Sequence, residues 1–193
     1  MPLTPRPDVI DFLLTRRSRP AKTLTGPGPD RETVEVILQA AARTPDHGKL
    51  EPWRFIVLEG AALTRLGALT RRRGVEAGVD PDKLDKHAHG FEANPLVIAV
   101  IAAPKPSDKI PEGEQILSAG AACLAALNAA LASGWGANWL TAWMATDRPW
   151  LREGLGLEDH ETVAGFIHIG TETIAPPERP RPAMAAITTW VDA

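Results

Sequence analysis

The sequence contains a single cysteine, Cys123, among 193 residues. No intrachain disulfide can therefore form, and a reducing compartment is expected. The first residues lack the order of charged, apolar and small residues that marks a signal peptide. There is also no run of about 18 uninterrupted apolar residues, the length needed to span a bilayer. We therefore expect a cytoplasmic protein without a membrane segment.

An excess of positive charge is also lacking. The chain has 21 Lys and Arg against 24 Asp and Glu, a formal net charge of -3. This balance gives no general electrostatic reason to bind nucleic acid or an anionic membrane. Arg71, Arg72 and Arg73 form a basic run without interleaved aromatic residues, which is more typical of a solvated helix face. Nucleic acid is not an expected partner.

Several chemical motifs are missing as well. No GxSxG elbow is present, and Cys123 has no recognisable histidine partner pattern, which disfavours hydrolysis. The segment GPGPD, residues 26 to 30, follows no strand and has prolines where a phosphate loop needs amide donors. His87 and His89 are two residues apart, but no further ligand cluster surrounds them. We expect no metal site.

What is present indicates one α+β domain over residues 1–193. Asp8 and Asp30 are suited to cap two helices, and Pro45 ends the second. Residues 53–59, WRFIVLE, alternate and favour a strand. The other expected elements are helices over 61–77, 112–133 and 147–155, and strands over 95–103, within 134–143 and over 162–171.

Three segments have unusual composition. Residues 80–94 are polar and weakly periodic, so we interpret them as a mobile excursion or lid over a binding site. Residues 172–193 are rich in proline and predict an extended C-terminal arm. Beyond Leu117, the helix over 112–133 is apolar or small on almost every side. Such a helix must be enclosed, either inside a domain or against a partner subunit.

Hydrogen-bond donors gather at the ends of the predicted elements. Arg16, Arg17 and Ser18 supply two guanidinium groups and a hydroxyl within three residues, a set able to bind a phosphate or the carbonyls of a heterocycle. Two arginines beside a helix C-terminus also fit an interaction with the helix dipole. Arg43 and His47 flank the end of the second helix, where a surface cap and an ordinary histidine are the alternative.

A third set lies at the start of the strand within 134–143. Trp139, Leu140 and Thr141 offer an aromatic plane, an apolar wall and a hydroxyl. Ordinary strand packing is the alternative interpretation. Each set is a weak signal alone, and their order along the chain carries more information than any one of them.

In that order, the chain resembles the nitroreductase family of flavoproteins, in particular its short YdjA-like bacterial branch of NAD(P)H nitroreductases. The resemblance rests on four segments: RRS (16–18), AARTPDHGKLEPWRFIV (41–57), SAGAACLAALNAALASGWGANWLTAW (118–143) and GFIHIGT (165–171). It implies a nitroreductase-like α+β fold with a mostly antiparallel sheet flanked by helices. It also implies an intertwined homodimer with FMN at two equivalent sites in the subunit interface.

The resemblance assigns roles to the three sets. Arg16, Arg17 and Ser18 would meet the FMN held by their own subunit, and Arg43 and His47 the FMN held mainly by the other subunit. Further cofactor contacts and a segment associated with nicotinamide are also implied. The implied further FMN contacts are Trp139, Leu140 and Thr141, and the nicotinamide segment is Ala129, Ala130, Leu131, Ala132, Ser133 and Gly134.

Two positions depart from the family pattern. Leu140 stands where close relatives can carry an arginine, so a polar flavin contact is lost or moved. Near the C-terminus many members have a basic residue that binds the phosphate; here we assign that role to Arg181, with Arg179 as the other possibility.

The implied activity is hydride transfer from NADH or NADPH to the N5 atom of FMN, and then to an electron-poor small molecule such as a nitroaromatic or a quinone, in a ping-pong mechanism. No side chain is nominated as a catalytic acid or base. Two alternatives stay open: other flavin chemistry on the same fold, such as oxidation of a specialised metabolite or flavin fragmentation, or a flavin-binding dimer without turnover.

Overall fold

A computed structural model describes residues 3–192 of the chain. Its centre is a sheet in which β2 (Trp53–Glu59), β3 (Leu96–Ala102) and β5 (Thr162–Glu172) pair antiparallel. On the other side of β5 lies β4 (Gly136–Leu140), and the two-residue β1 (Leu24–Thr25) pairs with the last residues of β5. The 11 residues of β5 are enough to pair with three strands, which makes β5 the backbone of the sheet.

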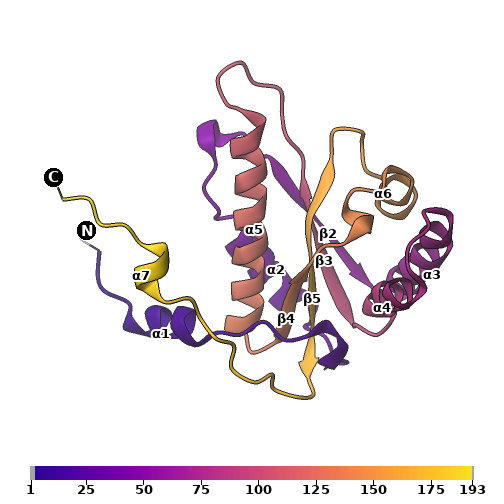
Figure 1. The fold of residues 1–193 in the computed structure, drawn as a ribbon, viewed down its shortest axis with the longest axis horizontal. Coiled ribbons are helices and arrows are strands. Elements are labelled where there is room, and N and C mark those ends of the chain that lie inside the picture. The colour runs from indigo at the N-terminus through magenta and orange to yellow at the C-terminus, as the bar shows by residue number, and fades with distance from the viewer. Residues whose placement is uncertain (1–2, 193) are drawn as a thin grey trace.

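Helices cover both faces of this sheet, as Figure 1 shows. One face carries α2 (Arg31–Ala41) and α5 (Glu112–Ala132). The other carries α3 (Ala61–Glu76), α4 (Pro81–Glu92) and α6 (Arg148–Leu155), with the rings of Phe91, Trp150 and Phe166 packed together beneath them. Every residue of β3 is buried, which confirms the prediction of a central strand covered on both sides.

The first residues of α1 (Pro7–Thr15) and α2 show whether the predicted caps, Asp8 and Asp30, are formed. The Asp30 carboxylate accepts a hydrogen bond from the Thr33 amide at 2.9 Å, so the predicted cap of α2 is confirmed. The predicted Asp8 cap is wrong, because α1 begins one residue earlier, at a proline that already has helical φ. Asp8 lies in the first turn, and its carboxylate instead forms an ion pair with Arg6 at 2.9 Å.

Most of the segment 80–94 forms a regular helix, α4 (Pro81–Glu92). Our expectation of an irregular excursion was therefore wrong. Asp80 accepts a hydrogen bond from the Lys83 amide at 3.1 Å, and Pro81 opens α4. Leu84, Ala88 and Phe91 recur at offsets of four and three and are buried against α3 and the sheet. The apolar stripe is narrow, and charged residues on the rest of the helix hide it in the sequence. A lid role for 80–94 stays a prediction.

Apolar surface is left uncovered on the outer side of α5. By length and composition α5 could cross a membrane, but its inner face packs against the sheet and α2. On its outer face Ile116, Leu117 and Leu124 are exposed. Helix α1 has no buried residue at all, although it carries Ile10 and Leu14. The sequence analysis expects the helix over 112–133 to be enclosed inside the domain or against a partner; the structure encloses only the inner face of α5, and a partner on the outer face stays a prediction.

Helix α1 and the C-terminal arm lie on the α5 side of the molecule, outside the layers of the sheet and its covering helices (Figure 1). The C-terminal arm follows β5 and passes α1, where the Arg17 guanidinium donates to the Pro177 carbonyl at 2.9 Å. The arm is not extended throughout, since a single helical turn, α7 (Met184–Ile187), forms once the prolines end at Pro182. The remaining elements are the 3-10 turns η1 (Ala21–Thr23), η2 (His47–Lys49) and η3 (Trp143–Ala145).

Candidate functional site

The first predicted set leaves α1 as a bent, half-buried segment. Helix α1 ends at Thr15, and the backbone of Arg16 turns to extended geometry (φ -57, ψ 143). The Arg16 guanidinium donates to the Ser18 hydroxyl oxygen at 3.0 Å. The Arg19 amide donates to the Ala137 carbonyl at 2.8 Å, which fixes this segment against the start of β4. The RRS tripeptide is therefore held at the C-terminal end of α5, where β4 begins.

This segment concentrates positive charge. Burial lowers the pKa of Arg16 from its ordinary value, and the nearby charges of Arg181, Arg17 and Arg19 lower it further. Arg19 has Glu172 as an ion-pair partner at 3.1 Å, and Arg181 has Glu178 at 3.3 Å. Within residues 3–192, neither Arg16 nor Arg17 forms an ion pair, and the Nε atom of each is buried without a hydrogen-bond partner. Buried guanidinium donors that repel one another are stabilised by an anion.

An arginine of the C-terminal arm also contributes to the charge around Arg16. Arg181 is 165 residues from Arg16 in sequence, yet close enough to act on its charge state, whereas Arg179 is not among the residues that do so. The structure thus brings together Arg16, Arg17, Ser18 and Arg181. Whether Arg181 or Arg179 binds the phosphate stays a prediction.

The second set lies on the loop that follows α2. Residues 43–51, here called the 43–51 loop, connect α2 to β2 and include three positions with left-handed backbone: Gly48 (φ 68), Lys49 (φ 56) and Glu51 (φ 49). Non-glycine residues rarely adopt such angles. Where they do, neighbouring contacts impose the conformation, and such positions cluster at functional sites. The His47 Nδ1 atom is 2.7 Å from a Glu114 carboxylate oxygen, and both Arg43 and His47 are exposed.

Within one chain, the first and second sets are at opposite ends of α5. His47 contacts Glu114, in the first turn of this helix, whereas Arg19 is bound to Ala137, just past its last residue. A helix of 21 residues is about 30 Å long, which exceeds the length of a nucleotide-sized ligand. One such ligand cannot contact both sets of the same chain.

Two residues that hold the 43–51 loop were missed by the sequence analysis. Ser118 is buried on α5; its hydroxyl donates to the Pro45 carbonyl at 2.9 Å and accepts from the Trp53 indole at 3.1 Å. Glu114 lies one turn earlier and binds His47. The available signal was a serine on the mostly apolar inner face of the helix, four residues after a glutamate, but the partners of this serine are distant in sequence.

The third set is at the C-terminal end of β4. Trp139 donates its indole N–H to the Ala164 carbonyl at 3.3 Å and is half-buried. Leu140 and Thr141 are exposed at the strand end. The segment predicted for nicotinamide, 129–134, forms the last turn of α5 and its end, where Gly134 takes a positive φ of 84. It adjoins the RRS segment through the start of β4.

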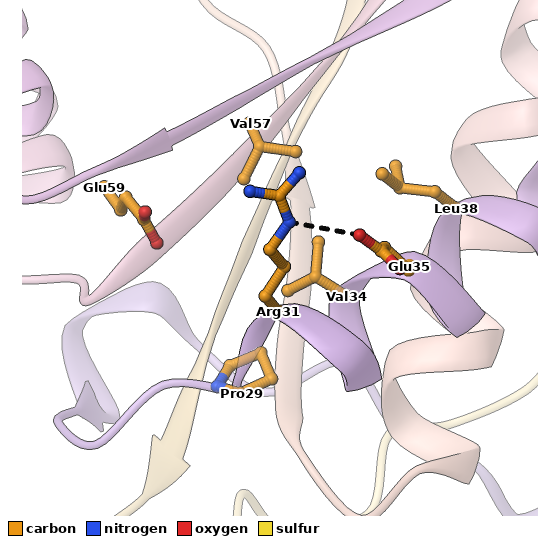
Figure 2. Close-up of a pocket in the computed structure, with 7 residues that line it drawn as sticks. All are labelled: Pro29, Arg31, Val34, Glu35, Leu38, Val57 and Glu59. Atoms are coloured by element: carbon orange, nitrogen blue, oxygen red, sulfur yellow. Dashed lines mark hydrogen bonds and ion pairs between the residues drawn. The ribbon is translucent and has the colours of Figure 1, made fainter.

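A cleft of about 380 Å³ lies elsewhere, between α2 and the outer edge of β2 (Figure 2). Its wall contains an exposed ion pair between Arg31 and Glu35 at 3.1 Å. None of the predicted site residues lines it, so it is not the candidate site. The residues that line the cleft are Pro29, Arg31, Val34, Glu35, Leu38, Val57 and Glu59.

Comparison with known proteins decides the family. The model of the nitroreductase family matches residues 13–171, which is most of the chain. The chain belongs to the nitroreductase family. Escherichia coli (strain K12) YdjA, named as an NAD(P)H nitroreductase, is 36% identical over 164 residues, covering 85% of this chain and 88% of YdjA. A Haemophilus influenzae protein, also named as an NAD(P)H nitroreductase, is 39% identical over 165 residues, covering 85% of this chain and 88% of that protein.

Solved structures confirm the nitroreductase-like fold. A nitroreductase-like protein from Bacillus cereus superposes with a TM-score of 0.81 over the whole of both chains, at 19% identity. A Desulfovibrio desulfuricans protein named as a nitroreductase and solved in complex with FMN superposes with a TM-score of 0.75. It is 24% identical, and the match covers 98% of this chain and 99% of that one. The predicted α+β architecture with a mostly antiparallel sheet between helices is thus confirmed.

Proposed function

We propose that this member of the nitroreductase family is an FMN-dependent NAD(P)H oxidoreductase that works as a homodimer. The observation that carries the proposal is the arginine set at the end of α1. Arg16 and Arg17 are half-buried, have no carboxylate partner among residues 3–192, and each leave a buried Nε atom without an acceptor. The relatives named as NAD(P)H nitroreductases and the similar structure solved with FMN support the choice of ligand.

The phosphate of FMN fits this set by charge and by number of donors. A phosphate dianion accepts several hydrogen bonds, and arginine binds it through paired N–H groups. Arg16, Arg17 and Ser18 supply donors from one segment, and Arg181 approaches from the C-terminal arm. A hydrogen bond to a charged group contributes about 1.5 to 3 kcal/mol, whereas micromolar binding requires about 8 kcal/mol, so this set needs additional contacts.

A second chain supplies the missing contacts in this proposal. Arg43 and His47 cannot reach the ligand that the RRS segment of their own chain holds, because α5 separates them. The exposed apolar residues of α1 and of the outer side of α5 provide a surface for a second copy. In a two-fold dimer each arginine set would face the 43–51 loop of the other chain.

When bound, FMN supplies two-electron chemistry by accepting hydride from NADH or NADPH and passing it to an electron-poor acceptor such as a nitroaromatic or a quinone. Arg16, Arg17, Ser18 and Arg181 would bind the phosphate, Arg43 and His47 of the second chain would supply positive charge and donors, and Trp139, Leu140 and Thr141 would line the same site. None of them is required as an acid or base. The 129–134 segment, next to the arginine set, is the proposed place of the nicotinamide donor.

One set of measurements tests FMN binding, the dimer and reduction of the flavin by NADH or NADPH. Purified protein reconstituted with FMN is expected to show a bound-flavin spectrum with one flavin per chain and the mass of a dimer by light scattering. Mixing it with NADH or NADPH under anaerobic conditions should bleach the flavin within seconds. A colourless protein after reconstitution would reject the cofactor, and bound flavin that stays oxidised for minutes with both nucleotides would reject the reductase activity.

A further inference from the structure

Beyond the proposed site residues, the first turns of α5 hold the 43–51 loop in place. Ser118 is 7% exposed, and both bonding functions of its hydroxyl are used inside the protein: it donates to the Pro45 carbonyl and accepts from the Trp53 indole. A hydroxyl engaged in this way is not free to bind a ligand. Its effect is to join α5, β2 and the 43–51 loop at one point.

The shape of this loop depends on such anchors. Left-handed backbone at Lys49 and Glu51 is unfavourable for side chains other than glycine and persists where neighbouring contacts impose it. Besides Ser118, the contacts include a hydrogen bond from the Glu51 amide to the Asp46 carboxylate at 2.8 Å. At Gly48, an added β-carbon would come within 2.5 Å of the Ile110 side chain, just before α5.

Glu114 acts on the ring of His47. A carboxylate accepts hydrogen bonds and does not donate them, so the Nδ1 atom at 2.7 Å from Glu114 carries the proton. This fixes which nitrogen of the neutral imidazole is the donor and directs the Nε2 atom away from Glu114. Both side chains are more than one-third exposed in a single chain, which leaves the Nε2 edge accessible to a second copy.

We propose that Glu114 and Ser118 are positioning residues that orient His47 and Arg43 toward the FMN bound by a second chain, an inference that rests on the proposed function. Ser118 sets the path of the 43–51 loop, and Glu114 sets the tautomer and direction of the His47 ring. In this proposal neither residue contacts the cofactor, because the Ser118 hydroxyl is bonded inside the protein and Glu114 acts through the His47 ring. The loss of either should therefore weaken cofactor binding through Arg43 and His47, while the arginine set at the end of α1 stays intact.

The first experiment needs no cofactor. Nitrogen-15 NMR of histidine-labelled apoprotein, with the His47 signals assigned from His47→Gln, should show Nδ1 protonated in the parent. Glu114→Gln retains an amide oxygen that can accept this proton and should keep the pattern. Glu114→Ala should shift His47 toward the Nε2–H form. An unchanged ring pattern in Glu114→Ala would overturn the role of Glu114.

The second experiment measures the dissociation constant of FMN. Glu114→Ala and Ser118→Ala should each weaken binding about 10-fold, equivalent to about 1.4 kcal/mol. Glu114→Gln and Ser118→Thr, which keep the hydrogen bonds, should stay within about 2-fold of the parent. Glu112→Ala is the matched control, because it also removes a carboxylate from the first turn of α5 but has no bonded partner among residues 3–192.

Outcomes of the two experiments separate the inference from the proposed function. If the parent binds FMN and both alanine variants bind it equally well, the positioning role is rejected and the proposed function stands. If the parent binds no FMN, the proposed function fails, and with it the role of Glu114 and Ser118 toward FMN; the NMR pattern still decides the orientation of His47. For Ser118→Ala, the exchange rate of the Trp53 indole proton shows directly whether the anchor is lost.

Discussion

The indole of Trp139 lies across the Cα atom of Gly165 on the neighbouring strand. An added β-carbon at position 165 would stand 2.1 Å from the Trp139 Nε1 atom and 3.0 Å from the Cys123 sulfur. The glycine thus makes room for the ring, whose N–H is directed to the Ala164 carbonyl. Cys123 beneath it is fully buried, and burial raises the pKa of its thiol to about 12, so it packs as a neutral side chain.

Replacing Gly165 by alanine should displace Trp139. The ring cannot remain in place, and forcing a methyl group into a packed site typically costs about 1 to 3 kcal/mol. We expect a lower free energy of unfolding in urea and weaker FMN binding, because Trp139 precedes Leu140 and Thr141 at the proposed site. Gly113→Ala is the control, since its added β-carbon meets no atom within 4 Å. Equal stability and FMN affinity in both variants would contradict this packing.

Replacing Arg16 by alanine should remove FMN while the fold remains. The Arg16 side chain is half-buried among other arginines, so its loss relieves repulsion in the free protein. Loss of one or two charged hydrogen bonds should weaken FMN binding by about 1.5 to 3 kcal/mol, roughly 10-fold to 150-fold. Flavin titration followed by fluorescence measures the affinity, and thermal unfolding of the apoprotein checks the fold.

Arg6→Ala provides the comparison for Arg16→Ala. Arg6 also flanks α1, but it is exposed and paired with Asp8. It should leave FMN binding unchanged. An Arg16→Ala variant that binds FMN as tightly as Arg6→Ala would remove Arg16 from the site.

Local signals in the sequence were enough to predict much of the fold. The Asp30 cap and the alternation over 53–59 are interactions between near neighbours, and the structure has both. Helix α4 was missed because its apolar stripe depends on a tertiary contact with α3, and most of its residues are polar. The donors of the candidate site were proposed from their places at the ends of predicted elements, and their roles from the family resemblance; those roles stay predictions. The role of Ser118 could not be predicted from the sequence, because its partners Pro45 and Trp53 are 73 and 65 residues away.

Stability should fall as the pH drops from about 6.5 to about 4, and His168 should contribute to this. Burial lowers the pKa of His168 to about 4, so the folded protein keeps this ring neutral while the unfolded chain protonates it near pH 6.5. In this window the unfolded state binds more protons, so stability rises with pH. The difference in pKa corresponds to an effect on the order of 3 kcal/mol. His168→Gln should have a flatter profile of unfolding free energy against pH, measured in urea. An equally steep profile would assign the effect to other groups.

A mixed dimer tests whether each site is shared between two chains. A dimer of one Arg16→Ala chain and one His47→Ala chain has one site with both changes and one site with neither, if the arginine set of each chain faces the 43–51 loop of the other. Such a dimer, purified with two different affinity tags, should bind about one FMN with the affinity of the parent, whereas either variant alone should bind weakly at both sites. A mixed dimer of one Arg16→Ala chain and one Ser18→Ala chain is the control. Each chain then carries a change in its own arginine set, so neither site is intact and no tight binding should return. If the first mixed dimer shows no recovery either, Arg16 and His47 do not meet across two chains.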